Sequence, residues 1–372
     1  MSKRKVDSKK IAISIILTVS ACLVLAAHLP MLAFSQLPFL RNSQTNANSN
    51  HRSTHSNDNK ISGSEATNLS SLNKLIKTTK PKPKSLTSQT YTIKVTENIS
   101  YKGADKFGIK EIYLTKKSGR EWYINMANPR NDPIFSLGSN QSIIKQNSSS
   151  SAGSNDNDIS WRITNPKVRM HVDTPPGSPQ WKNVEITGYV KVNNTNITTA
   201  EHHQNDIPNH IAWLARSGVH TDKAPCNGTD LSGSIDDDGS VGWKKEIWFT
   251  GGYTNESAQA KPTSSIVGRW IGWKTVVYNI DNNDKAVKME SYLDDKNNNH
   301  WARVTNLTDS GGWYADTSDK KFYRVDCGKP KDYIVTNSGP MIYFRADNMI
   351  LDFKDLSVRE IDPPPDPHPL SK

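Results

Sequence analysis

The sequence predicts an all-β protein, a two-sheet antiparallel sandwich of jelly-roll type, and three observations support this prediction. Short runs rich in aromatic and β-branched residues alternate apolar with polar side chains over most of the chain from Tyr91 onward. Loops rich in Asn, Asp and Gly separate these runs. The pattern predicts no amphipathic helix longer than two turns in this region. About ten such strands in a chain of 372 residues favour two packed sheets.

The amino terminus is a cluster of Lys and Arg followed by Ile11–Leu29, an uncharged and mostly apolar run. Its length suits either a secretory signal or a membrane anchor, so we expect residues 1–40 to export the chain. Positive charge before the run places the rest outside the cytoplasm, and membrane contact is expected only through this segment. Cys22 fits either a lipoprotein-type cleavage box or a plain apolar position.

Residues 41–88 form the next segment, which is rich in Asn, Ser, Thr and Lys and almost free of aromatic residues. Such a composition cannot bury enough apolar surface to fold, so it predicts a disordered basic linker. The first ninety residues carry the whole formal net charge of +10, which leaves the remainder close to neutral. The folded part therefore lacks the basic surface of a nucleic-acid-binding protein.

The sandwich is predicted over residues 89–362 and a short tail over 363–372. A Gly119 turn predicts a hairpin between Ile109–Leu114 and Glu121–Ile124, and Ser136–Asp158 is expected to be a surface loop. Asp236–Gly239 reads as a turn. The further predicted strands, in chain order, are Tyr91–Val95, Val168–Val172, Val184–Val192, Ile211–Arg216, Trp243–Trp248, Arg269–Tyr278, Lys285–Leu293, Trp301–Leu307, Met341–Arg345 and Leu356–Ile361.

All ten tryptophans lie between Trp122 and Trp313, inside the predicted sandwich. Each of them suits either core filling or stacking on a pyranose ring, because indole combines an apolar face with an N–H donor. Trp270 and Trp273 are three residues apart and cannot face the same way in a regular strand. We therefore expect one of them to be exposed, or a bulge at Gly272.

Charged and aromatic side chains share a face on three of the predicted strands, Trp243–Trp248, Arg269–Tyr278 and Lys285–Leu293. In each strand, period-two alternation places one such set of side chains on the same face. If the strands lie in one sheet, these sets form a sugar-binding groove; the alternative is a solvated face with ion pairs. The predicted substrate-binding residues are Lys244, Glu246, Trp248, Lys274 and Glu290.

Cys226 and Cys327 are the cysteines outside the amino-terminal segment, and in an exported domain they are expected to form one disulfide. Two buried free thiols are the alternative. Nine Asn-x-Ser/Thr sequons fit a glycoprotein, although a chain rich in these residues forms some by chance.

The run Trp273–Asn279 resembles the strand of jelly-roll alginate lyases that carries Lys-x-x-Val-Tyr-Asn. More broadly, residues 91–361 resemble exported concanavalin A-like domains related to polysaccharide lyases and lectins. The resemblance implies a catalytic role for Tyr278 as proton donor and acceptor, and a substrate contact for Lys274. A lyase must also neutralise a uronate carboxylate and remove the adjacent proton, and Arg216 and His220 are the candidates.

The lyase pattern is incomplete in this sequence, because its Arg-x-Glu-Leu and Gln-x-His strands are not matched. We therefore predict a polysaccharide-binding protein, with a uronate polymer lyase acting through Arg216, His220 and Tyr278 as the alternative. A hydrolase with Glu246 and Glu290 as paired carboxylates, and an adhesive protein without a sugar site, are further options. No cofactor is required, but a structural Ca²⁺ is predicted at Asp347, Asp352 and Asp355.

Overall fold

The computed structural model describes residues 99–147, 159–165, 167–195, 209–221, 223–250, 252–280, 284–315 and 325–363, all within one unit, Pro83–Lys372. The predicted export segment, the linker, the strand at Tyr91–Val95 and the tail beyond residue 363 lie outside these ranges. Within the described ranges no helix is long and apolar enough to cross a membrane.

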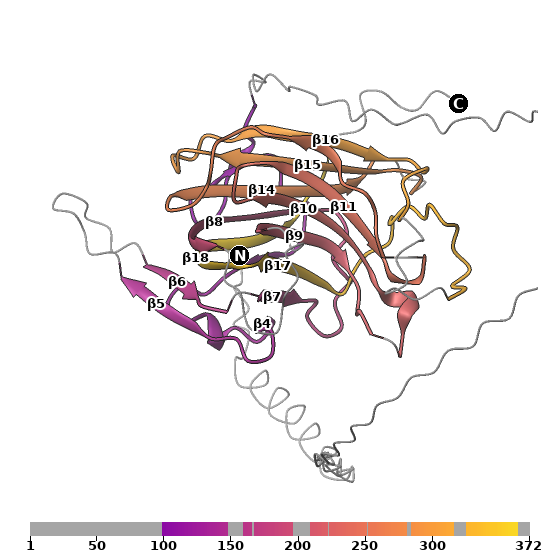
Figure 1. Ribbon diagram of the computed structural model, residues 1–372, viewed down its shortest axis with the longest axis horizontal. Coiled ribbons are helices and arrows are strands. Elements are labelled where there is room, and N and C mark those ends of the chain that lie inside the picture. The colour runs from indigo at the N-terminus through magenta and orange to yellow at the C-terminus, as the bar shows by residue number, and fades with distance from the viewer. Residues whose placement is uncertain are drawn as a thin grey trace, which may run out of the picture. The chain divides into compact units, whose positions relative to one another are not determined.

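Two antiparallel sheets make up the fold, which confirms the predicted all-β jelly-roll sandwich (Figure 1). We name them by a central strand. The β9 sheet contains, in spatial order, β12 (Gly252–Tyr253), β11 (Val241–Ile247), β10 (Thr229–Asp236), β9 (His210–Ser217), β17 (Met341–Asp347), β7 (Lys167–Asp173) and β4 (Phe135–Leu137), with β13 (Ser257–Ala260) paired to β11.

The β14 sheet contains, in spatial order, β16 (Ala302–Asp309), β15 (Val287–Asp294), β14 (Trp270–Asn279), β8 (Val184–Thr195), β18 (Met349–Glu360), β6 (Ile159–Ile163) and β5 (Ile143–Asn147), with β3 (Glu121–Tyr123) paired to β18. A separate ribbon pairs β1 (Gly103–Ala104) with β2 (Lys110–Glu111). Three single 3₁₀ turns complete the described elements: η1 (Pro129–Asn131), η2 (Pro225–Asn227) and η3 (Trp248–Thr250).

The main core lies between the two sheets and follows from period-two alternation. In β9, the residues Ile211, Trp213 and Ala215 face inward, and in β14 the same is true of Ile271, Trp273 and Val277. All of these side chains are essentially buried. Burying a large apolar side chain stabilises the fold by about 1.5–3 kcal/mol, so this layer is the main support of the sandwich.

The outer face of the β14 sheet is also covered, by the segment that contains β1 and β2. Ile109 and Ile112 of this segment pack with Val276, Tyr292 and Trp301 in a second apolar cluster. The predicted hairpin between Ile109–Leu114 and Glu121–Ile124 is therefore wrong: β2 pairs with β1, and β3 pairs with β18. Tertiary burial of apolar side chains outweighed the local turn signal.

Most other strand predictions are confirmed, with several differences. The expected loop Ser136–Asp158 contains β5 and the end of β4, and the strands β1, β6, β10, β12 and β13 were not predicted. No bulge occurs at Gly272, because β14 keeps a regular register with both neighbours. Trp273 is in the core and Trp270 is half-buried on the covered outer face, so neither is fully exposed. Asp236–Gly239 is the turn between β10 and β11, as predicted.

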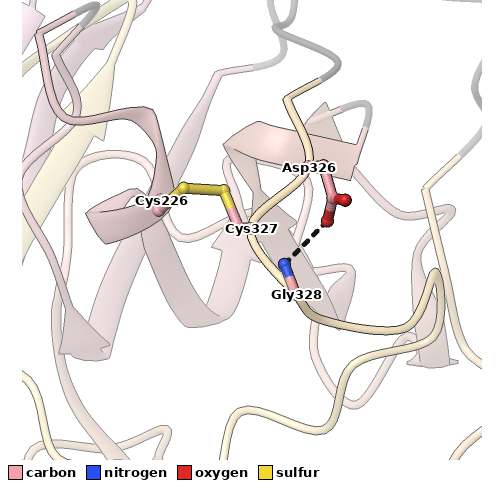
Figure 2. The surroundings of a disulfide bond; sticks show 4 residues. All are labelled: Cys226, Asp326, Cys327 and Gly328. Carbon is pink, nitrogen blue, oxygen red and sulfur yellow. Dashed lines mark hydrogen bonds between the residues drawn. A yellow bond between two sulfur atoms is a disulfide. The ribbon is translucent and has the colours of Figure 1, made fainter.

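The predicted disulfide is present between Cys226 and Cys327 (Figure 2). It joins η2 to the segment before β17, across a sequence separation of 101 residues, with the two Cα atoms 5.6 Å apart. Beside it, the Gly328 amide donates a hydrogen bond to the Asp326 carboxylate (Figure 2). The disulfide therefore anchors the loop that follows β9.

Candidate functional site

A cavity of about 690 Å³ lies on the outer face of the β9 sheet. It exists because odd-numbered residues of β10, such as Leu231 and Ile235, enter the core, while even-numbered ones point the other way. Ser232, Ser234 and Asp236 of β10 therefore line the cavity. The neighbouring strands contribute His210, Lys244, Tyr253 and Arg345 to its wall, and the segment between β12 and β13 contributes Thr254, Asn255 and Glu256.

Arg345 is held in this wall by two partners. Its Nε donates to Asp347 at 2.7 Å and its guanidinium donates to the Tyr253 hydroxyl at 3.1 Å. Burial alone would lower the pKa of Arg345, but the facing Tyr253 and Asp347 raise it, so the group stays charged. Burial raises the pKa of Tyr253, and the nearby charge of Glu246 adds to this effect, so its hydroxyl stays protonated.

His210 lies close to the same carboxylate, with its Nε2 3.3 Å from Asp347. Burial lowers the pKa of His210 to about 4, because its surroundings disfavour the charged ring. The imidazole is therefore neutral at neutral pH. Asp347 also accepts a hydrogen bond from Arg169 at 2.7 Å, so this one carboxylate contacts Arg169, Arg345 and His210.

Asp236 is the cavity residue whose titration falls near neutral pH. Burial and the neighbouring Glu256 raise its pKa to about 7. Between about pH 4 and 7 the carboxyl is charged in the unfolded chain and neutral in the folded one, so this group makes stability fall as pH rises through that window.

We therefore expect Asp236→Asn to flatten the decline of the melting temperature between about pH 4 and 7, measured by calorimetry in a pH series. Asp238→Asn is the matched control from the same turn. Hydrogen bonding to Lys261 lowers the pKa of Asp238, so this residue does not titrate in the window. Equal slopes in both variants and the wild type would contradict the assignment.

A second polar group adjoins the cavity and contains three of the predicted residues, His220, Glu246 and Trp248. Glu246 faces Asp230 as its direct partner in the β10–β11 ladder. The Trp248 indole donates to Glu246 at 2.5 Å and stacks on the His220 ring, with centroids 5.2 Å apart. Burial and the adjacent Glu246 raise the pKa of Asp230. Ligand atoms of His220, Asp230 and Glu246 all lie within 4.8 Å of one another.

The other predicted binding residues, Lys274 and Glu290, lie on the opposite side of the molecule. They belong to the β14 sheet, and the segment before β3 covers them. Lys274 donates to Glu185 and Thr187 at 2.9 Å each. Glu290 accepts from Tyr113 at 2.7 Å, from Tyr292 at 2.9 Å and from Arg303 at 3.1 Å. The single groove that would join them to Lys244 does not form, because the two sets of strands belong to different sheets.

The predicted catalytic residues are separated in the same way. Arg216 lies one residue before the end of β9 and is fully buried, and it donates to the carbonyls of Val335 at 2.6 Å and Lys182 at 3.2 Å. Burial lowers its pKa to about 9. Tyr278 packs against Tyr113 under the β14 sheet cover, with ring centroids 5.5 Å apart. Arg216, His220 and Tyr278 therefore do not share one site.

The three predicted calcium ligands do not converge. Asp347 is in the β9 sheet with its arginine partners, whereas Asp352 and Asp355 are in β18 of the β14 sheet. Arg162 binds both oxygens of Asp352, at 2.6 and 2.9 Å. Asp355 occupies a left-handed position with φ of 55° beside a register shift in β18. Arginine side chains supply the positive charge at Asp347 and Asp352.

Sequence reasoning missed Asp230, His210, Tyr253 and Arg345 as site residues. Arg345 lies on a predicted strand, where alternation with Phe344 marks it as outward-facing. Asp230 carried little signal, because β10 is rich in small polar residues and does not resemble a strand.

No family model matches the sequence, and neither does any curated protein. Similar solved structures include the endo-β-1,4-glucuronan lyase from the fungus Trichoderma reesei, with 8% identity over 66% of this chain and 98% of that chain and a TM-score of 0.36. A Bacillus subtilis protein of unknown function with a galectin-like fold has 10% identity over 67% and 98%, with a TM-score of 0.35. The Ca²⁺-bound exoplasmic/lumenal domain of VIP36 has 10% identity over 64% and 87%, with a TM-score of 0.33. At these values no activity is transferred from them to this chain.

Proposed function

We propose that this protein binds a polysaccharide in the cavity on the outer face of the β9 sheet. The observation that supports this most directly is the composition of its wall, which mixes the hydroxyls of Ser232 and Ser234 with charged groups of both signs. Sugar hydroxyls both donate and accept hydrogen bonds, so they match a wall that offers both kinds of partner. Tyr253, which is 37% exposed, provides an aromatic surface for a pyranose ring.

Lys244 is the best residue for testing this proposal. It lines the cavity and forms no ion pair with any described residue, so its ammonium group is available to a ligand. A hydrogen bond to a charged group contributes about 1.5–3 kcal/mol, and its loss weakens binding by roughly 10-fold or more. We therefore expect Lys244→Ala to reduce affinity for the bound polysaccharide to that extent.

The experiment screens the purified protein against neutral and uronate polysaccharides by affinity electrophoresis, and then compares Lys244→Ala with Lys288→Ala. Lys288 is the matched control, because it lies on β15 of the other sheet and donates to Thr308 at 3.3 Å. Binding that Lys288→Ala retains and Lys244→Ala weakens is the expected result. Failure to bind any polysaccharide, or equal binding by both variants, would reject the proposal.

A uronate lyase is the second candidate, and one observation favours it. The cavity brings together Arg345, His210 and Tyr253. In a lyase, Arg345 would neutralise the uronate carboxylate, His210 would accept a proton and Tyr253 would donate one. A histidine whose pKa is about 4 is a weak base, which is why we favour binding. Ultraviolet absorbance from unsaturated sugar ends, lost in His210→Gln, would instead establish the lyase.

The proposal also includes export of the domain through its amino-terminal segment, with the polysaccharide outside the cytoplasm. The disulfide supports this location, because such bonds persist in oxidising compartments.

A further inference from the structure

Two carboxylates are buried side by side next to the cavity. Asp230 of β10 and Glu246 of β11 are direct ladder partners, and their side chains are 0% and 2% exposed. Among the described residues, neither oxygen of Asp230 accepts a hydrogen bond, and Glu246 accepts one, from the Trp248 indole. A buried carboxylate without a partner is costly, so this pair requires a positive charge or a proton between its members.

The described cations nearby do not meet this requirement. Arg345 is committed to Asp347 and Tyr253. His220 lies closer, with Nε2 at 4.0 Å from Asp230 and Nδ1 at 3.7 Å from Glu246. These separations are too long for hydrogen bonds. Nε2 is also buried without a hydrogen-bond partner among the described residues.

The same separations suit ligands of a common metal ion. Ligand atoms that share one zinc ion lie roughly 3–4 Å apart, because each is about 2 Å from the metal. An imidazole nitrogen with two carboxylate oxygens is a ligand set that zinc and related divalent transition metals accept. Trp248 contacts two of the three groups, through its hydrogen bond to Glu246 and its stacking on His220, and so orients them.

We propose that His220, Asp230 and Glu246 bind one divalent transition-metal ion of the zinc class. Three protein ligands leave one tetrahedral position to water or to a ligand. The site is held by the β10–β11 ladder on one side and by the loop after β9 on the other. Gly228 permits the close approach of that loop, because a Cβ there would lie 2.8 Å from the Trp248 Cβ and 3.1 Å from the His220 ring. This inference does not depend on the proposed sugar binding.

The test titrates chelator-treated full-length protein with Zn²⁺ and, separately, with Ca²⁺, by calorimetry and by tryptophan fluorescence. We expect Zn²⁺ to bind at this site more tightly than Ca²⁺, with a fluorescence change from Trp248. His220→Gln and Asp230→Asn should each weaken this binding about 100-fold. The chain contains ten histidines, and others among them can also bind zinc. The test therefore compares the zinc affinity of wild type and variant and does not rely on the total amount of zinc bound.

The matched controls are His171→Gln and Asp173→Asn. Their side chains form another His–Asp contact, 3.1 Å long, on the same sheet, and both should bind zinc as the wild type does. His220 is a loop residue with a 26% exposed side chain, so His220→Gln should fold even if Asp230→Asn does not. Zinc binding that survives His220→Gln would overturn the proposal. So would the absence of zinc binding in the wild type, because the carboxylates would then share a proton.

Discussion

Replacing Glu185 by glutamine is expected to lower the free energy of unfolding by about 3–5 kcal/mol, because it removes the anion from a buried charged cluster. Glu185 is 0% exposed and its oxygens lie 2.9 Å from Lys274 and 2.9 Å from Arg359. Burial alone would raise its pKa, but the two cations together lower it. Glutamine keeps the shape but removes the carboxylate that faces the buried Lys274, and it leaves Arg359 with Glu111, 3.3 Å away, as its acidic partner among the described residues.

Urea denaturation followed by tryptophan fluorescence measures this effect. Lys261→Ala is the control, because its contact with Asp238 is exposed on both sides and such pairs contribute about 1 kcal/mol or less. The folded Glu185→Gln protein should still bind the same polysaccharide, because the cluster lies in the other sheet. A loss no greater than that of Lys261→Ala would show that the cluster is not a major source of stability.

Cys327→Ser is expected to lower the free energy of unfolding by about 4–5 kcal/mol, the value that the loop-entropy account gives for a loop of about 100 residues. The disulfide spans 101 positions and ties η2, which follows the His220 loop, to the chain before β17 (Figure 2). Removing it lets the unfolded chain explore conformations that the covalent link excludes.

Thermal and urea unfolding measure this effect. Three samples are compared: the wild type without a reductant, the wild type with a reductant, and Cys327→Ser. The reduced wild type and Cys327→Ser should lose the same stability. Cys22→Ser is the control, because it leaves both disulfide cysteines in place. A reduced wild type as stable as the oxidised one would contradict the expected contribution of the bond.

Strand predictions succeeded where apolar and polar residues alternate strongly, as in β8, β11 and β14, since this period defines a strand with two different faces. Among strands of five or more residues they missed β5, β6 and β10, and they gave β3 the wrong partner. The signal in β10 is weak because Ser232, Gly233 and Ser234 have low β-propensity. The partner of β3 was assigned to its neighbour in sequence, but β3 pairs with β18, which lies more than 200 residues further along the chain.

The candidate site was predicted in part. Lys244 and Glu246 are correctly grouped on one face of β11, because alternation along one strand is a local property, whereas Trp248 lies in η3 directly after the strand and joins them through its hydrogen bond to Glu246. Lys274 and Glu290 were wrongly joined to them, because sheet membership depends on long-range pairing. The resemblance to a lyase strand placed Lys274 and Tyr278 at a substrate site, whereas the structure places them beneath the segment that contains Ile109 and Ile112.

By itself, the sequence determined the fold class, the disulfide partners and the faces of single strands, because these depend on local periodicity and on counting cysteines. Only the tertiary structure decided which outer face is open to a ligand. The β14 sheet is covered by an apolar segment, so its charged groups pair with one another; the β9 sheet is not, so its polar residues line a cavity. Beside that cavity, side chains from β10, β11 and the loop after β9 meet because ladder pairing brings Asp230 opposite Glu246, and no local pattern encodes that pairing.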